Sequence, residues 1–122
     1  VLHGRGCQVP YKPTHAKHPC TLWAGDTRAN FTWLCDLGEA LCEEYEYRYG
    51  RTHKCREVIA LCRSMSGHVP GGPATPFVQA MPDEHKREDP VEGYREFYRS
   101  SKSHMAVWTR RGAPAWYFQV AS

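Results

Sequence analysis

The sequence predicts a small all-α protein, a single-domain helical bundle with a long irregular N-terminal arm and long connecting loops. The length of 122 residues and a composition of 41% hydrophobic and 24% charged residues are typical of one globular domain with one core. Apolar residues recur at the three- and four-residue spacing of helices, and no segment shows the alternation of a strand. These observations predict one domain over 1–122.

The arm and the main helix come first. Residues 1–25 are predicted to be irregular, because glycines and prolines interrupt them too often for a long helix. Asp26 or Thr27 can cap a main helix over 26–49, and Gly50 can end it. Acidic residues occupy one face of this helix, and a buried apolar stripe is expected on the other. The stripe consists of Phe31, Leu34, Cys35, Gly38, Leu41, Cys42, Tyr45 and Tyr49.

Two shorter helical segments follow, separated by loops rich in Gly and Pro. The second helix is predicted over 52–65, with Thr52 as its cap. A third helical segment, 90–109, begins after Asp89, a good N-cap residue that precedes a proline. The final residues, 110–122, are predicted to form an aromatic tail. The inward-facing residues of the second helix are expected to be Cys55, Val58, Ile59, Cys62 and Met65.

Charge is unevenly distributed, although the net charge is only +3. Segments 1–20, 51–68 and 102–122 are basic, and two acidic segments alternate with them. If the basic segments fold onto one face, they form a surface that binds phosphates. A mixed-sign surface that only keeps the protein soluble is the alternative.

The six cysteines favour a reducing compartment and a cytoplasmic location. Their share of the sequence is below that of a disulfide scaffold, and no Cys-x-x-Cys pair occurs. Cys35 and Cys42 stand seven residues apart, as do Cys55 and Cys62. Seven residues are about two helical turns, so each pair shares a face on which cysteine is a small buried hydrophobe.

Local motifs identify no enzyme, metal or cofactor. His15, His18 and Cys20 form the one cluster of metal-ligand type, but the spacing is loose and a fourth ligand is not evident. These histidines are expected to serve hydrogen bonds or phosphates instead. There is no phosphate-binding glycine loop and no Gly-x-Ser-x-Gly elbow. The longest apolar run, Val58 to Cys62, is far too short to cross a membrane.

The first constellation with chemical meaning lies where the main helix ends. Glu44 and Arg48 are four residues apart and can pair on one helix face. Arg51, His53 and Lys54 follow in a loop, where the amides of the next helix offer an anion site. The functional interpretation is a phosphate clamp. The alternative is a surface ion pair with basic residues that complement the helix C-terminus.

The second constellation is the tail. Arg110 and Arg111 precede Trp116 and Tyr117, and arginines interleaved with aromatic rings are typical of surfaces that hold unstacked nucleic acid. The alternative is that the aromatic side chains fold back onto the core.

Several motifs resemble the pyrimidine-dimer DNA glycosylase superfamily of the endonuclease V type, and specifically its phage-type members. The resemblance covers roughly residues 10–118. It is carried by His18-Pro19, Trp23, Asn30-Phe31, Trp33-Leu34, the segment from Leu41 to Tyr45, Arg48, His53-Lys54, the segment from Gln79 to Glu84, and Pro114 to Tyr117.

This resemblance implies a compact helical DNA-repair enzyme that cleaves a glycosidic bond and then nicks the abasic strand. In the family, an N-terminal α-amine forms a Schiff base and a carboxylate on the first helix assists it. No helix is expected before Pro10, so the family's first helix has no counterpart here. Only binding positions carry over: the tail aromatics and arginines, and the His18-Pro19 loop. Catalytic residues stay unknown.

The sequence therefore predicts a DNA-binding protein that resembles a base-excision glycosylase or abasic lyase acting on damaged pyrimidines. The alternatives are a non-catalytic DNA-binding module of the same fold and a structural or protein-interaction domain. The expected partner is double-stranded DNA, intact or damaged, with no membrane and no cofactor. Residues 1–25 or a partner subunit are expected to fill the groove that the absent helix leaves open. A homo-oligomer or a missing N-terminal segment is therefore among the alternatives. The predicted DNA-binding residues are Lys12, His15, Lys17, His18, Arg51, His53, Lys54, Arg110, Arg111, Trp116 and Tyr117.

Overall fold

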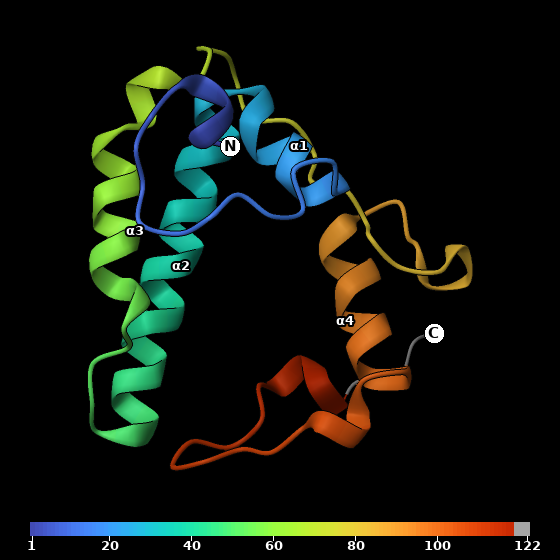
Figure 1. Cartoon of the computed structure of the whole chain (residues 1–122). Coiled ribbons are helices and arrows are strands. Elements are labelled where there is room, and N and C mark those ends of the chain that lie inside the picture. The colour runs from blue at the N-terminus through green and yellow to red at the C-terminus, as the bar shows by residue number, and fades with distance from the viewer. Residues whose placement is uncertain (119–122) are drawn as a thin grey trace. The chain divides into compact units, whose positions relative to one another are not determined.

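The computed structural model describes residues 1–118, and these residues are all-α (Figure 1). They contain four α-helices joined by loops and short 3-10 turns, and no strand. Contacts divide the chain into two compact units, Val1–Phe77 and Val78–Ser122, where the sequence predicts one domain. Each unit has its own elements.

Helix α1, Pro19–Asp26, lies inside the stretch that is expected to be irregular, so that prediction is wrong for residues 19–25. Proline suits the first position of a helix because the amide it lacks would have no partner there. The His18 side chain caps the helix by accepting a hydrogen bond from the Cys20 amide at 3.1 Å. The arm before α1 contains only the 3-10 turn His3–Arg5.

Helix α2, Arg28–Tyr49, starts and ends close to the predicted boundaries. The Thr27 hydroxyl caps it by accepting from the Asn30 amide at 3.1 Å. Gly50 ends it in the left-handed conformation with φ 69°, and its amide donates to the Glu46 carbonyl.

Helix α3, Cys55–Ser64, runs back alongside α2, so the two form an antiparallel hairpin (Figure 1). The predicted cap, Thr52, lies outside the helix, which begins three residues later. The Nδ1 atom of His53 instead accepts a hydrogen bond from the Cys55 amide at 3.0 Å. A histidine therefore takes the role that the sequence assigns to a threonine.

The core of the first unit joins parts of the chain that are distant in sequence. Leu2 from the arm, Phe31 and Cys35 from α2, and Val69 after the 3-10 turn Ser66–His68 form its buried cluster. Partly buried side chains surround this cluster: Val1, Cys7, Val9, Ile59, Cys62 and Met65.

Residues 69–77, here called the strap, pass from the end of the hairpin back to α1. The Arg28 amide donates to the Pro70 carbonyl at 2.7 Å, and the Arg28 guanidinium donates to the carbonyls of Ser66, Gly67 and Val69. These bonds fix the start of the strap to the first turn of α2.

The second unit is built around helix α4, Pro90–Ser100, which the Asp89 carboxylate caps as predicted. The helix ends at Ser100, so the predicted helical segment 90–109 is too long by nine residues. Three of the four residues from 100 to 103 are serines, whose hydroxyls compete with the helix for backbone bonds. Short 3-10 turns pack against α4: Asp83–His85, Ser103–Met105 and Ala115–Phe118. The predicted tail residues 119–122 lie outside the described chain.

Candidate functional site

The predicted DNA-binding residues of the arm are all exposed. Lys12 and Lys17 form no ion pair with any residue that the structure describes. His15 adopts φ 53°, in the left-handed region, and turns the arm toward α1. Its ring meets the ring of His18 edge-on, with 6.4 Å between centroids. His18 caps α1 through Nδ1, so this atom is an acceptor and carries no proton.

The turn between α2 and α3 presents the second predicted group. Arg51 and Lys54 are exposed, and neither forms an ion pair within residues 1–118. His53 is half-buried and its ring lies edge-on against Tyr45, with 4.8 Å between centroids. Because its Nδ1 caps α3, His53 is a structural residue of the turn as well as a candidate ligand residue.

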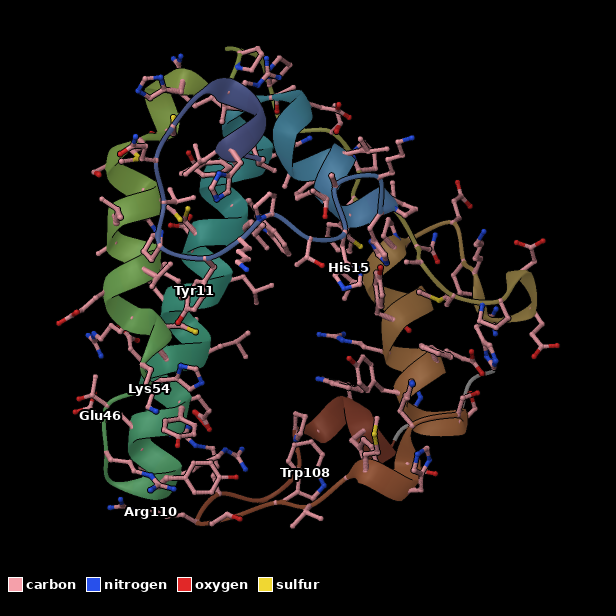
Figure 2. The ribbon with its side chains drawn as sticks, in the orientation of Figure 1. Tyr11, His15, Glu46, Lys54, Trp108 and Arg110 are labelled. Carbon is pink, nitrogen blue, oxygen red and sulfur yellow. The ribbon has the colours of Figure 1, made fainter. Side chains whose placement is uncertain are left out.

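The arm and the turn stand apart on the first unit, and Figure 2 shows His15 and Lys54 well separated. The turn follows the C-terminal end of α2, whose 22 residues span about 33 Å. The structure therefore provides two cationic groups on this unit instead of one cluster.

Three arginines of the hairpin differ from the cations of the arm and the turn, because each forms an ion pair with an acidic side chain. Arg48 pairs with Glu44 at 2.9 Å, which confirms the predicted pair. Arg56 pairs with Glu46 at 3.1 Å. Arg63 contacts the carboxylates of Asp36 and Glu39 at 2.6 and 2.8 Å, and hydrogen bonds to Glu39 and then to Asp36 raise its pKa further. Arg28 has no acidic partner either, but its guanidinium donates to the carbonyls of Ser66, Gly67 and Val69. The remaining cations of this unit that have no acidic partner lie in the arm and the turn.

The tail residues belong to the second unit. Arg110 and Arg111 are exposed. Trp116 is half-buried beneath Arg95, whose guanidinium carbon lies 5.3 Å from the ring centroid. Tyr117 packs edge-on against Trp108. These contacts support the interpretation that the tail aromatics fold back onto their own unit, because both rings already have packing partners.

An apolar groove of about 340 Å³ lies between α2 and α3, next to the turn. The sequence does not predict this groove, although the paired cysteine spacings lie on the two helices that form it. A single sequence gives no register between two helices, and the register decides which side chains line the groove. The lining residues are Gly38, Leu41, Cys42, Tyr45, His53, Cys55 and Ile59.

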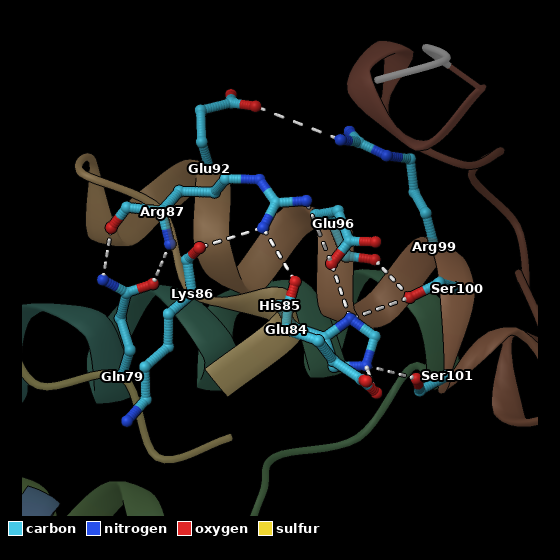
Figure 3. Close-up of polar contacts among 10 residues, drawn as sticks. All are labelled: Gln79, Glu84, His85, Lys86, Arg87, Glu92, Glu96, Arg99, Ser100 and Ser101. Carbon is cyan, nitrogen blue, oxygen red and sulfur yellow. Dashed lines mark hydrogen bonds and ion pairs between the residues drawn. The ribbon is translucent and has the colours of Figure 1, made fainter. Parts of the chain in front are cut away.

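The second unit holds a polar network that sequence reasoning also missed (Figure 3). His85 Nδ1 lies 2.7 Å from Glu96 Oε2, and His85 Nε2 lies 3.1 Å from Ser101 Oγ. The hydrogen bond from His85, with smaller contributions from Ser100 and Arg87, lowers the pKa of Glu96. These residues form no recognisable motif in the sequence, so the network could not be predicted from it.

The order serine, histidine, carboxylate is that of a nucleophile, a base and an orienting group. Ser101, however, follows the C-terminal end of α4, where the helix dipole is negative and opposes a developing oxyanion. Glu84 also reaches His85 Nε2, at 3.3 Å, and competes with the serine. The network therefore holds the 3-10 turn Asp83–His85 against α4.

Within residues 1–118, no group of three or more His, Cys, Asp or Glu side chains is placed to hold a metal ion. No helix in the same residues combines the length and apolar character that a membrane crossing requires.

Comparison with known proteins yields no match to any family model, curated protein or solved structure.

Proposed function

We propose that this chain binds double-stranded DNA through the cations of the arm and the turn. The observation that carries the proposal is the sorting of cations in the first unit. Arg48, Arg56 and Arg63 are neutralised by acids, whereas Lys12, Lys17, Arg51 and Lys54 are exposed without an acidic partner in residues 1–118. Unpaired exposed cations are what a phosphate backbone requires.

The histidines add to this proposal without adding fixed charge. His18 and His53 each lie beside an unpaired lysine and accept an amide hydrogen through Nδ1. Their Nε2 atoms can then donate to a phosphate oxygen while the ring stays neutral. Each group would thus offer a lysine and a histidine donor to the backbone.

The resemblance to the glycosylase superfamily extends the proposal to damaged pyrimidines and strand incision. No catalytic residue is assigned, because the family's first helix has no counterpart in this chain. A cytoplasmic location is part of the same proposal, since a reducing compartment keeps all six cysteines as the thiols of the structure.

Fluorescence anisotropy with labelled duplexes, one intact and one with an abasic site, tests the proposal at several salt concentrations. We expect the logarithm of affinity to fall linearly with the logarithm of salt, by about 0.9 per phosphate neutralised. Replacing Lys12 and Lys17 together, or Arg51 and Lys54 together, with alanine should each weaken binding and reduce that slope by about 1.8.

Arg56→Ala is the matched control, because Arg56 is an exposed arginine near the turn that Glu46 already neutralises. It should leave the slope unchanged. A flat salt response, or equal losses for Arg56→Ala and the two double variants, would exclude DNA binding by these groups. Preference for the abasic duplex would lead to incision assays, and equal affinity would leave a simple DNA-binding module.

A protein-interaction function is the second candidate, and the exposed apolar side of α2 favours it. Leu34, Leu37 and Leu41 share this side and are 44%, 40% and 60% exposed. Sedimentation velocity distinguishes the two candidates, because self-association would cover this face and Leu41→Lys should abolish it. A monomer at all concentrations would count against a second copy as the partner.

A further inference from the structure

The four cysteines of the hairpin face each other in two pairs, and the helix register shows this. A Cβ atom on Gly38 would lie 2.9 Å from Cδ1 of Ile59, so these two residues lie opposite one another. In an antiparallel hairpin, moving by a number of residues toward the turn along one helix corresponds to moving by the same number toward the turn along the other. Three steps away from the turn place Cys35 opposite Cys62.

Four steps toward the turn place Cys42 opposite Cys55. Independent contacts agree with this register. Cys35 belongs to the buried cluster and Cys62 packs against that cluster, while Cys42 and Cys55 line the same groove. The two cysteines of α2, seven residues apart, therefore lie opposite the two cysteines of α3, which have the same spacing.

We propose that the hairpin is a redox modification site in which Cys42 and Cys55 form an interhelical disulfide under oxidising conditions, followed by Cys35 and Cys62. A disulfide requires Cα atoms within about 7 Å. Gly38 lies between the two cysteine positions of α2 and has no side chain to hold the helices apart. The inference is independent of DNA binding.

The oxidant is a small disulfide of the glutathione type. The Cys55 thiolate attacks one sulfur of oxidised glutathione, and one glutathione thiolate leaves and takes up a proton. The Cys42 thiolate then attacks the Cys55 sulfur of the mixed disulfide and releases the second glutathione. Two thiols become one disulfide, and the two electrons reduce oxidised glutathione to two glutathione thiols.

The groove explains the order of the two pairs. Each pair has one buried and one half-buried cysteine, but Cys42 and Cys55 line the open groove, whereas Cys35 and Cys62 lie in and against the core. Burial also raises the pKa of both Cys35 and Cys62, so their thiolates are scarce at neutral pH. The pair in the core therefore reacts after the groove pair.

The test is a redox titration of the whole chain with glutathione, followed by proteolysis and mass spectrometry without reductant. The expected product at intermediate potential is a peptide crosslinked through Cys42 and Cys55, with a mass loss of about 2 Da for the disulfide. Since a disulfide restricts the unfolded chain, the oxidised protein should melt roughly 10 °C higher than the reduced protein.

Cys55→Ser and Cys42→Ala are the variants, and circular dichroism of their reduced forms shows whether each folds. Cys55→Ser should lose both the crosslink and the rise in melting temperature. Cys42→Ala should retain glutathione on Cys55 as a mixed disulfide, because the resolving thiol is absent. The proposal is overturned if the folded wild-type chain gives only mixed disulfides, or if its crosslinks join other pairs first.

Discussion

At the scale of single residues, Asn30 is the side chain on which the first unit depends most. It is fully buried, and all of its amide bonds are made within the chain. Its Nδ2 donates to the Trp23 carbonyl and to Thr75 Oγ1, both at 2.9 Å, and its Oδ1 accepts from the Thr75 amide at 2.9 Å. One amide thus joins α1, α2 and the strap.

Asn30→Ala should lower the free energy of unfolding by about 3 kcal/mol, because it leaves buried partners unsatisfied. Urea unfolding followed by circular dichroism measures the change. Thr32→Ala, at a half-buried position of the same helix, is the control and should change stability by less than about 1 kcal/mol. Equal effects would mean that the amide bonds of Asn30 are not the cause.

Cysteine reactivity should divide according to burial. Burial raises the pKa of Cys35 and of Cys62, and for Cys35 this effect outweighs the lowering of its pKa by the nearby Arg63 guanidinium. Because the thiolate is the reactive form, iodoacetamide at pH 7.5 should modify the exposed Cys20 well before these two. Mass spectrometry of the reduced native protein, with a urea-unfolded sample as control, gives the order. Modification of Cys35 as fast as Cys20 would contradict the burial.

The second unit should lose stability at acid pH, because Glu96 becomes protonated there. The hydrogen bond from His85 holds the pKa of Glu96 below its usual 4.5. A carboxylate with a lowered folded pKa stabilises the fold above its unfolded pKa, and this stability is lost as pH falls through the folded value. Wild type should therefore exceed Glu96→Gln in stability above pH 5, and the gap should narrow below about pH 4.5.

Denaturant unfolding of both proteins from pH 7 to pH 3 measures that gap. Glu92→Gln is a suitable control, because Glu92 forms longer, more exposed ion pairs at 3.4 and 4.0 Å. A constant gap for Glu96→Gln over the whole range would show that its charge does not matter.

At the scale of elements, one glycine fixes how the second unit packs on α4. Gly93 is buried, and the Gln79 side chain lies directly above it. That side chain donates to the Arg87 carbonyl at 2.6 Å and accepts from the Arg87 amide at 2.9 Å. A Cβ atom on Gly93 would overlap Gln79 Oε1.

Gly93→Ala should destabilise the protein by about 1–3 kcal/mol, because the added methyl displaces Gln79 and breaks both bonds. The direction is informative, since glycine to alanine inside a helix otherwise stabilises by up to about 1 kcal/mol. Thermal unfolding measures it. In a Gln79→Ala background, Gly93→Ala should instead stabilise the protein, because the clash with Gln79 is gone. If Gly93→Ala still destabilises that background, the loss of stability does not come from the contact with Gln79.

The helices that the sequence predicts best are those whose signals are local. Thr27, Gly50 and Asp89 act as predicted because a cap depends only on its own turn. The apolar stripe of α2 is only partly buried: Phe31, Cys35 and Cys42 are covered, while Leu34, Leu41 and Tyr49 are exposed. Periodicity marks a face, but only tertiary packing shows how much of that face is covered.

In the candidate site too, local features can be predicted from the sequence and features that depend on tertiary packing cannot. Exposure of the arm and the turn follows from their composition, and the sequence predicts it. The groove and the His85 network could not be predicted, because they depend on the register of α2 against α3 and of α4 against the preceding turn. Acidic partners of the hairpin arginines follow from that register too, apart from the local pair Glu44–Arg48.

At the scale of the whole molecule, hydrophobic burial is unequal between the units. Among the side chains that the structure describes, in residues 1–117, every buried hydrophobic one lies in the first unit: Leu2, Trp23, Ala24, Phe31, Cys35, Cys42 and Val69. In the described part of the second unit, Gly93 is the buried residue. The second unit is held by half-buried aromatics, ion pairs and hydrogen bonds.

Hydrogen exchange measured by mass spectrometry should therefore protect α2 more strongly than α4. Amides protected by a packed core exchange only through larger openings. A fragment of residues 1–77 should retain cooperative unfolding, because its core contains no residue of the second unit. Equal protection of α2 and α4, or a fragment that melts without cooperativity, would contradict this division.

The strap has a consequence for the order in which the chain folds. The α2–α3 hairpin connects neighbours in sequence, so it can form early and quickly. The strap reaches Asn30 and Trp23 across 45 and 52 residues, and closing such long loops is slow. Trp33 stacks on Phe77 with 5.1 Å between centroids, so stopped-flow fluorescence should report this closure as a phase later than the gain of helical dichroism.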